Sequence, residues 1–275
     1  YFIMLFLWVG MEVNSQSLTI TSDQKIEYHT FENGDRIPDY SYCGYKASDE
    51  PIPFVEAKIK VSCQEGDATG RIQRAIDYVS ALPMQADGFR GAIQLEKGEY
   101  RMDGSLRITQ SGVVLRGSGY GLNGTVLLAT GTDRSTLIRI AGQGDKKISD
   151  SIPVASQYVP LNATVIPLAI GHGLKVGEHI TVTRPSTKEW IQSIGADKIG
   201  TYVDYQLTHW EPRDFDLCWE RTIVETSPTS VTIDVPLTNS LDAEMGGGYI
   251  SRCQWNGRIK TVGIEKLICV SEYDP

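Results

Sequence analysis

The spacing of apolar residues changes from a helical to a strand-like period near residue 90. Before that point, apolar side chains fall on one helical face of the segment 66–82, at Ile72, Ala75, Ile76 and Val79. Asp67 or Thr69 can cap the start of this segment, and Pro83 follows its end. The pattern predicts a single amphipathic helix of about four turns.

From Ile93 onward, short apolar pairs alternate with polar residues and are separated by turns that contain glycine. The pairs recur at nearly constant intervals. Val113 follows Ile93 by 20 residues, Val126 follows Leu106 by 20, and Leu137 follows Leu115 by 22. Three short strands in each repeat of this length predict a β-solenoid, in which every strand pairs with its equivalent one turn later.

A solenoid leaves unpaired backbone groups at the edge of its first coil. The helix predicted over 66–82 precedes the first strands and has one apolar face, so we expect it to cover that edge. The alternative is a β-sandwich, which favours hairpin turns and antiparallel pairing. The short glycine turns favour stacked coils.

The repeat is lost after residue 141. Two strand patterns, 174–183 and 229–237, flank a polar and aromatic stretch over 184–221, and alternation returns over 259–270. We therefore expect a small β-rich subdomain inserted into the solenoid. The predicted divisions are a partial signal peptide at 1–20, a leader at 21–65, a capping helix and first coils at 66–140, the insertion at 141–258, and resumed, truncated coils at 259–275.

Residues 1–10 are apolar and uncharged, too few to span a bilayer but typical of the central region of a secretory signal. The alternative is an N-terminal core strand or helix. The signal interpretation predicts a secreted, periplasmic or cell-surface protein with no membrane span in its mature form. The net charge of −8 argues against nucleic acid as a partner, and the five cysteines lack zinc-site spacing. Cys269 alternates with Leu267, which predicts a buried thiol.

The runs 66–83 (GDATGRIQRAIDYVSALP) and 88–119 (GFRGAIQLEKGEYRMDGSLRITQSGVVLRGSG) resemble the start of pectate-lyase-like proteins of the pectin lyase superfamily. Segment 263–271 looks like the next coil of that family, and 39–53 looks like the leader of its bacterial members. The resemblance implies an all-β fold, a right-handed parallel β-helix with an N-terminal capping helix, of which this chain is an N-terminal fragment. It implies an exported bacterial protein with a polysaccharide substrate.

The function that the resemblance implies is that of a polysaccharide lyase acting by β-elimination on glycans that contain uronic acid. In such lyases a cation, often Ca²⁺, neutralises the carboxylate, and an arginine or lysine removes a proton. A glycoside hydrolase with paired carboxylates is one alternative. Another is a non-catalytic glycan-binding module of the adhesin or tailspike type. No catalytic residue of the family maps onto a matched motif in this chain.

The stretch with the densest chemistry is 208–221 (THWEPRDFDLCWER). Flat aromatic faces stack on sugar rings, and polar groups bond sugar hydroxyls. The candidate substrate-binding residues are Trp190, His209, Trp210, Arg213, Asp214 and Trp219. The alternative is that the tryptophans form the core of the inserted subdomain. His209 has a side chain suited to general-base catalysis, although a lone histidine is more often structural.

Arg116 lies beside Leu115, whose position predicts an inward side chain, so we expect Arg116 to point outward from its coil. Two uses are open. Arg116 can face an anionic sugar, or it can brace the following turn by bonding backbone carbonyls.

Overall fold

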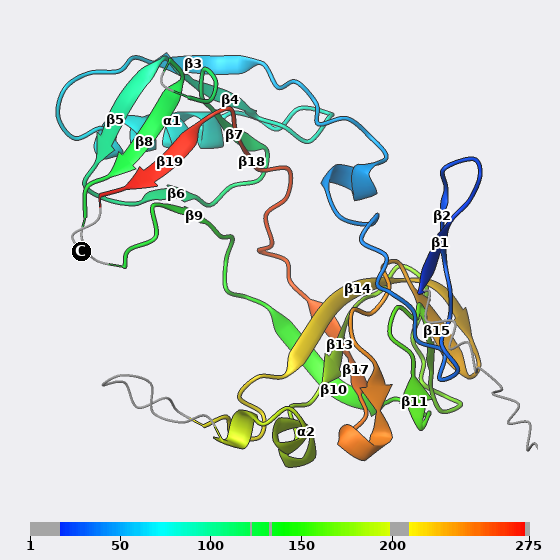
Figure 1. Cartoon of the computed structure of the whole chain (residues 1–275). Helices are drawn as coiled ribbons and strands as arrows, with labels where there is room; N and C mark the ends of the chain where they lie inside the picture. The colour runs from blue at the N-terminus through cyan, green and yellow to red at the C-terminus, as the bar shows by residue number, and fades with distance from the viewer. Residues whose placement is uncertain (1–16, 122, 132–133, 199–208, 273–275) are drawn as a thin grey trace, which may run out of the picture. The chain divides into compact units, whose positions relative to one another are not determined.

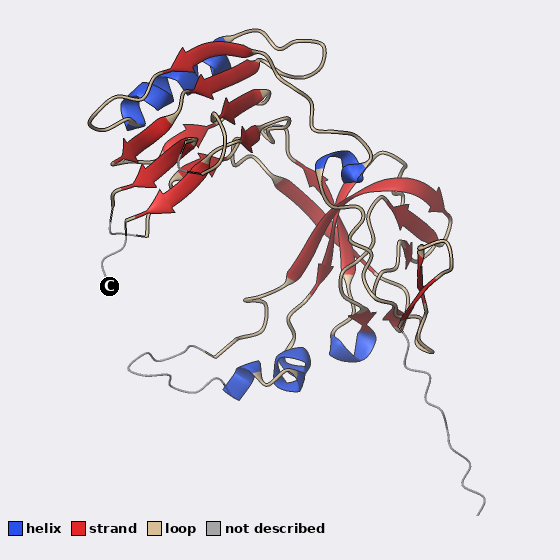
Figure 2. Cartoon of the chain, turned by 45° about the horizontal axis from the view of Figure 1, so that its top comes forward, coloured by secondary structure: helices blue, strands red, loops and turns tan. Residues whose placement is uncertain are grey.

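The computed structural model describes residues 17–121, 123–131, 134–198 and 209–272. Strands dominate this part of the chain, and helices are few (Figure 2). The all-β prediction is therefore confirmed. The signal prediction for residues 1–10 falls outside the described residues. No helix of the described part is long and apolar enough to cross a bilayer.

The chain divides into two units. Unit 1 comprises residues 1–50 and 148–254, and unit 2 comprises residues 51–147 and 255–275. Unit 2 holds the helix α1 (Thr69–Ala81) and the strands β3 (Ala57–Val61), β4 (Gly91–Leu95), β5 (Gly98–Met102), β6 (Leu106–Ile108), β7 (Val113–Arg116), β8 (Thr125–Ala129), β9 (Ile138–Ile140), β18 (Gly263–Glu265) and β19 (Ile268–Ser271).

The strands of unit 2 form three sheets, in the orders β18-β7-β4-β3, β19-β8-β5 and β6-β9. All pairs described in these sheets are parallel. Figure 1 shows the C-terminal strand β19, in red, beside β8 and β5. Parallel neighbours cannot be joined by tight hairpins, so the antiparallel sandwich is not the arrangement of this unit.

The pairing differs in detail from the predicted repeat of twenty residues. Ile93 pairs with Leu115, at an offset of 22 residues, whereas Leu106 pairs with Ile138 and not with Val126. Leu115 pairs with Ile264 and not with Leu137. The repeat is therefore uneven, because the turns before β8 and β9 are longer than the others and because the chain passes through unit 1 between β9 and β18.

The helix α1 buries one face against these strands. Its four apolar residues Ile72, Ala75, Ile76 and Val79 are all buried and belong to the same hydrophobic cluster as Ile93, Leu95, Tyr100, Met102, Leu106, Ile108 and Leu115. The predicted helix and its apolar face are thus confirmed. The inward positions of successive strands supply the other side of this core.

Two side chains of unit 2 differ from their predictions. Cys269 stacks in register on the fully buried Leu127, but it is exposed because β19 is the edge strand of its sheet. Arg116 lies outside the cluster that holds Leu115, as predicted, but it is buried, with 3% of its surface exposed, and its Nη2 has no hydrogen-bond partner in the described part of the chain. It forms an ion pair with Glu265, its neighbour on β18, and lies over the ring of Phe54 at 4.4 Å from the centroid.

Unit 1 is built around a six-stranded sheet with the order β10-β17-β13-β14-β15-β12. Its elements are β1 (Leu18–Ile20), β2 (Ile26–Tyr28), β10 (Lys147–Pro153), β11 (Tyr158–Val159), β12 (Val165–Pro167), β13 (His179–Arg184), α2 (Lys188–Ser193), β14 (Leu217–Ser227), β15 (Ser230–Ile233), β16 (Leu241–Asp242) and β17 (Tyr249–Gln254), with short 3₁₀ helices at Tyr45–Ser48, Ala196–Lys198 and Ala243–Met245.

The neighbours of β13 and β15 in this sheet pair antiparallel, and their inward residues form a second hydrophobic core. β15 falls inside the pattern predicted over 229–237, whereas β13 overlaps the pattern over 174–183 and ends one residue beyond it; each strand is shorter than its pattern. The N-terminal segment packs on this unit. The Asp35 carboxylate accepts hydrogen bonds from the Tyr158 hydroxyl and the Leu161 N–H, both at 2.7 Å.

Candidate functional site

The candidate site of unit 1 lies where β13 ends and α2 begins. Thr187 caps the helix, because its hydroxyl accepts a hydrogen bond from the Trp190 N–H at 3.3 Å. The same hydroxyl donates to the Met245 carbonyl at 2.9 Å, which ties the start of α2 to a distant turn. This short helix therefore holds Trp190 at a defined place, half-buried beside the sheet.

Ser186 fixes the segment that faces α2. Its side chain is fully buried, and its hydroxyl accepts hydrogen bonds from the N–H groups of Arg213 and Phe215 at 3.0 and 3.2 Å. The hydroxyl also donates to the Asp216 carboxylate at 3.1 Å. Arg213 adopts φ 78°, a left-handed conformation that is strained for this residue type. The turn is thus determined by one buried serine.

Three aromatic rings meet between α2 and this turn. Trp210 stacks on Phe215 with ring centroids 4.1 Å apart, and it meets Trp190 in a tilted arrangement at 6.1 Å. The guanidinium of Arg184 lies over the ring of Trp190, 4.8 Å from its centroid. Burial lowers the pKa of Arg184 from its usual range. Phe215 is 45% exposed, so the cluster presents an aromatic surface to solvent.

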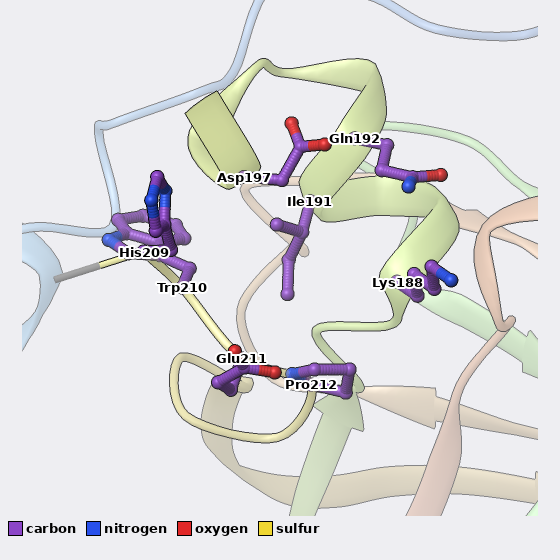
Figure 3. Close-up of a pocket in the computed structure, with 8 residues that line it drawn as sticks. All are labelled: Lys188, Ile191, Gln192, Asp197, His209, Trp210, Glu211 and Pro212. Carbon is purple, nitrogen blue, oxygen red and sulfur yellow. The ribbon is translucent and has the colours of Figure 1, made fainter. Parts of the chain in front are cut away.

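A pocket of about 380 Å³ lies beside this cluster, and Figure 3 shows the side chains around it. One wall comes from α2 and the short helix after it, and the other from the returning segment that includes Trp210. The lining residues are Lys188, Ile191, Gln192, Asp197, His209, Trp210, Glu211 and Pro212. The volume lies within the range of small-molecule sites.

Several polar side chains of the pocket are available to a ligand. One carboxylate oxygen of Asp197, Oδ1, is buried and has no hydrogen-bond partner in the described part of the chain. A buried acceptor without a donor costs free energy, so a hydroxyl group that reaches it is stabilised there. Lys188, Gln192 and Glu211 are exposed around the opening. Two carboxylates against one ammonium favour hydroxyl-rich neutral ligands over anionic ones.

The structure brings together three of the residues predicted from the sequence. His209 and Trp210 line the pocket, and Trp190 contacts Trp210. Trp219 does not line it. The Trp219 ring packs against the core of unit 1, and its Nε1 donates to the Thr238 hydroxyl at 2.9 Å.

Arg213 and Asp214 are engaged within the turn itself. The Arg213 guanidinium donates to the Tyr249 hydroxyl at 2.9 Å and pairs with Asp216 at 3.2 Å. The hydrogen bond with Tyr249 raises the pKa of Arg213. Asp214 accepts a hydrogen bond from the Glu211 N–H at 3.2 Å. These contacts shape the wall that carries Trp210.

Seven residues of the site were not among the predicted candidates: Lys188, Ile191, Gln192, Asp197, Glu211, Pro212 and Phe215. Phe215 stands within the stretch 208–221, and its aromatic character was the available signal. Asp197 lies outside any motif. Only the fold shows that it lines a pocket together with residues 209–212.

A calcium site was implied by the resemblance, and the described residues do not fit one. No group of three or more His, Cys, Asp or Glu side chains in the described ranges is arranged to hold a metal. Ca²⁺ takes about six to eight oxygen ligands, far more than the two carboxylates of the pocket offer. We derive no step through a metal.

The chain was compared with protein families, with curated proteins and with solved structures. No family model matches the chain, and no curated protein does. Structures similar to this one include phage tailspikes. Tailspike Gp54 of Acinetobacter baumannii bacteriophage AP22, solved with A. baumannii capsular saccharide, is 8% identical, with a TM-score of 0.37 over 75% of this chain.

Tailspike gp61 of Pseudomonas phage phi297 is 13% identical, with a TM-score of 0.37 over 72% of this chain. Tailspike gp49 of Pseudomonas phage LKA1 is 14% identical, with a TM-score of 0.34 over 67% of this chain. This chain covers 29%, 26% and 24% of the three tailspike chains, in the order given. Likenesses of this size carry no argument about function, and the pectate-lyase-like resemblance remains a prediction.

Proposed function

We propose that this protein binds glycan, and that the pocket between α2 and residues 209–212 receives a sugar unit. The observation that carries the proposal is the combination in one place of an aromatic cluster and a buried, unpartnered carboxylate oxygen on Asp197. Sugars present an apolar ring face and a rim of hydroxyl donors, and a site of this kind accommodates both.

The charges of the pocket refine the class of ligand. Asp197 and Glu211 accept hydrogen bonds from hydroxyls, whereas Lys188 and Gln192 can donate to ring or hydroxyl oxygens. The excess of carboxylates favours neutral hexose units over uronates at this position. The implied lyase reaction acts on uronates, which this excess of carboxylates disfavours, and we propose binding without cleavage here.

We further propose that unit 2 is the first part of a right-handed parallel β-helix, with α1 as its cap. Three sheets of parallel strands in register, and an amphipathic helix buried on the same core, support this. Parallel strands joined by crossover connections are right-handed in about 98% of cases. We also propose that the protein is exported, on the apolar pattern of residues 1–10 alone.

The test is isothermal titration of the full chain with a panel of neutral, amino-sugar and uronate-containing oligosaccharides. We expect saturable binding of a neutral oligosaccharide. The Asp197→Asn variant keeps the shape of the side chain but removes its charge, so we expect an affinity loss of about tenfold to a hundredfold, the size of one hydrogen bond to a charged group. The matched control is Glu189→Gln, an acidic residue of the neighbouring helix α2 that does not line the pocket.

Two results would contradict the proposal. One is the absence of binding to any member of the panel by the folded chain. The other is equal affinity of the wild type and Asp197→Asn for the sugar that binds. Absorbance from an unsaturated product in the same mixtures would show that the protein cleaves the glycan as a lyase.

A further inference from the structure

A second pocket, in unit 2, has the composition of an anion site. It has a volume of about 370 Å³ and lies between the edge strand β3 and the first turns of α1. Its polar lining consists of Lys60, Ser62, Gln64, Arg71 and Arg74. Three of these five side chains are cations, and no acidic residue lines the pocket.

The cations of this pocket have few partners. Arg71 Nη1 donates to Gln64 Oε1 at 3.3 Å, while its Nε and Nη2 are buried and have no hydrogen-bond partner. Lys60 and Arg74 are exposed, and neither forms an ion pair with a residue of the described part of the chain. Buried guanidinium donors without an acceptor are costly, and the repulsion of three like charges adds to that cost.

The charge of Asp67 interacts with that of Arg71, but the Asp67 carboxylate is already hydrogen-bonded to other groups. Its Oδ1 accepts from the N–H and hydroxyl of Thr69, at 2.9 and 2.6 Å, and from the Asp103 N–H at 3.1 Å. These hydrogen bonds, with that from the Thr69 hydroxyl first, hold the pKa of Asp67 below its usual value, and the charge of Arg71 contributes least. Asp67 therefore serves the start of α1 and leaves the pocket cationic.

We propose that this pocket binds a tetrahedral oxyanion, a phosphate or sulfate group. Such a group offers several strong acceptors to the forked donors of two arginines and the ammonium of a lysine. The Ser62 hydroxyl adds a neutral donor. The pocket is larger than a free phosphate requires, so the group can be carried by a sugar or another small molecule. This site uses no residue of the pocket in unit 1 and is independent of the glycan-binding proposal.

The test titrates the full chain with inorganic phosphate, sulfate and glucuronate in an amine buffer, at an ionic strength held constant with sodium chloride. We expect saturable binding of phosphate and sulfate, followed by calorimetry. A phosphosugar such as glucose 1-phosphate then distinguishes a free ion from an ester. A higher affinity for the phosphosugar than for inorganic phosphate indicates that the sugar fills the remainder of the pocket.

The substitutions Lys60→Gln and Arg74→Gln remove exposed charges and leave the core intact. We expect each to weaken phosphate binding about tenfold, because each removes one charge-assisted contact. The control is Arg139→Gln, an exposed arginine on β9 in the same unit that does not line the pocket. Equal loss in the control, no binding of phosphate, or equal binding of glucuronate would each overturn the proposal.

Discussion

Replacement of Tyr100 by phenylalanine tests the core of unit 2 through a single hydroxyl group. The Tyr100 side chain is fully buried on β5. Its hydroxyl lies within hydrogen-bond distance of the Val61 carbonyl at 2.8 Å and of the Glu96 carbonyl at 3.0 Å. The substitution keeps the ring and removes only this donor.

The structure limits the cost at neutral pH. The Val61 carbonyl keeps a hydrogen bond from the Glu96 N–H at 3.0 Å, and the Glu96 carbonyl keeps one from the Thr125 hydroxyl at 2.9 Å. Neither acceptor is left without a partner. We therefore expect Tyr100→Phe to lower the free energy of unfolding by about 1 kcal/mol, the value of one net hydrogen bond, and not by the larger cost of an orphaned carbonyl.

The effect reverses in alkali. Burial raises the pKa of Tyr100 from 10.0 to about 12. A pKa that is higher in the folded than in the unfolded state contributes stability below the unfolded value, and this contribution is lost as pH rises toward the folded value. As the pH rises from below 10 to above 12, the wild type loses about 3 kcal/mol of stability that the variant, with no phenol at this position, does not lose. The free energies of unfolding of the wild type and the variant should become equal at about pH 11.

The assay is urea denaturation followed by circular dichroism, for both proteins, at intervals from neutral pH upward. The other tyrosines are common to the two chains and cancel in the difference. A difference in the free energy of unfolding that stays constant with pH would refute the reasoning, since it would mean that the Tyr100 phenol is as accessible in the folded protein as in the unfolded chain.

Three further substitutions probe packing. Leu115→Ala empties a fully buried position and should cost about 2–5 kcal/mol in urea denaturation; a cost below about 1 kcal/mol would contradict the assigned core. In Gly117→Ala the new Cβ would clash with the Lys266 carbonyl oxygen, so amide exchange in β18 and β19 should accelerate, and unchanged protection would count against their pairing. Ser186→Ala removes the hydroxyl that accepts from two N–H groups and donates to Asp216, so tryptophan fluorescence should shift to longer wavelength. An unaltered spectrum would show that the turn forms without this hydroxyl.

The sequence was informative where periodicity alone decides the element. The helix over 66–82 and the strands of unit 2 follow from the spacing of apolar residues, since a buried face must repeat with the period of its element. The partners of the strands could not be read in the same way. Leu106 pairs with Ile138 because the intervening turns lengthen the repeat, and turn length does not appear in the apolar pattern.

The burial of charged side chains was the other feature that the sequence did not predict. As predicted, Arg116 lies outside the hydrophobic cluster that holds Val113 and Leu115, but the sequence could not show that it is buried, because the Glu265 carboxylate that pairs with it belongs to a strand 149 residues later in the chain. At the candidate site, aromatic residues were found by their type, whereas Asp197 matters only because the fold leaves its oxygen without a partner. Contacts between residues far apart in sequence decide both cases.

The central claim, that the pocket of unit 1 binds glycan, is tested most directly by the indole N–H signals of the tryptophans in a nuclear magnetic resonance titration. Trp190 and Trp210 belong to the aromatic cluster, Trp219 packs in the core of the same unit, and Trp255 lies in unit 2. On addition of the oligosaccharide that binds, we predict shifts of the Trp190 and Trp210 signals, with Trp219 and Trp255 unmoved. Shifts confined to Trp219 or Trp255, or no shift at saturation, would contradict the account.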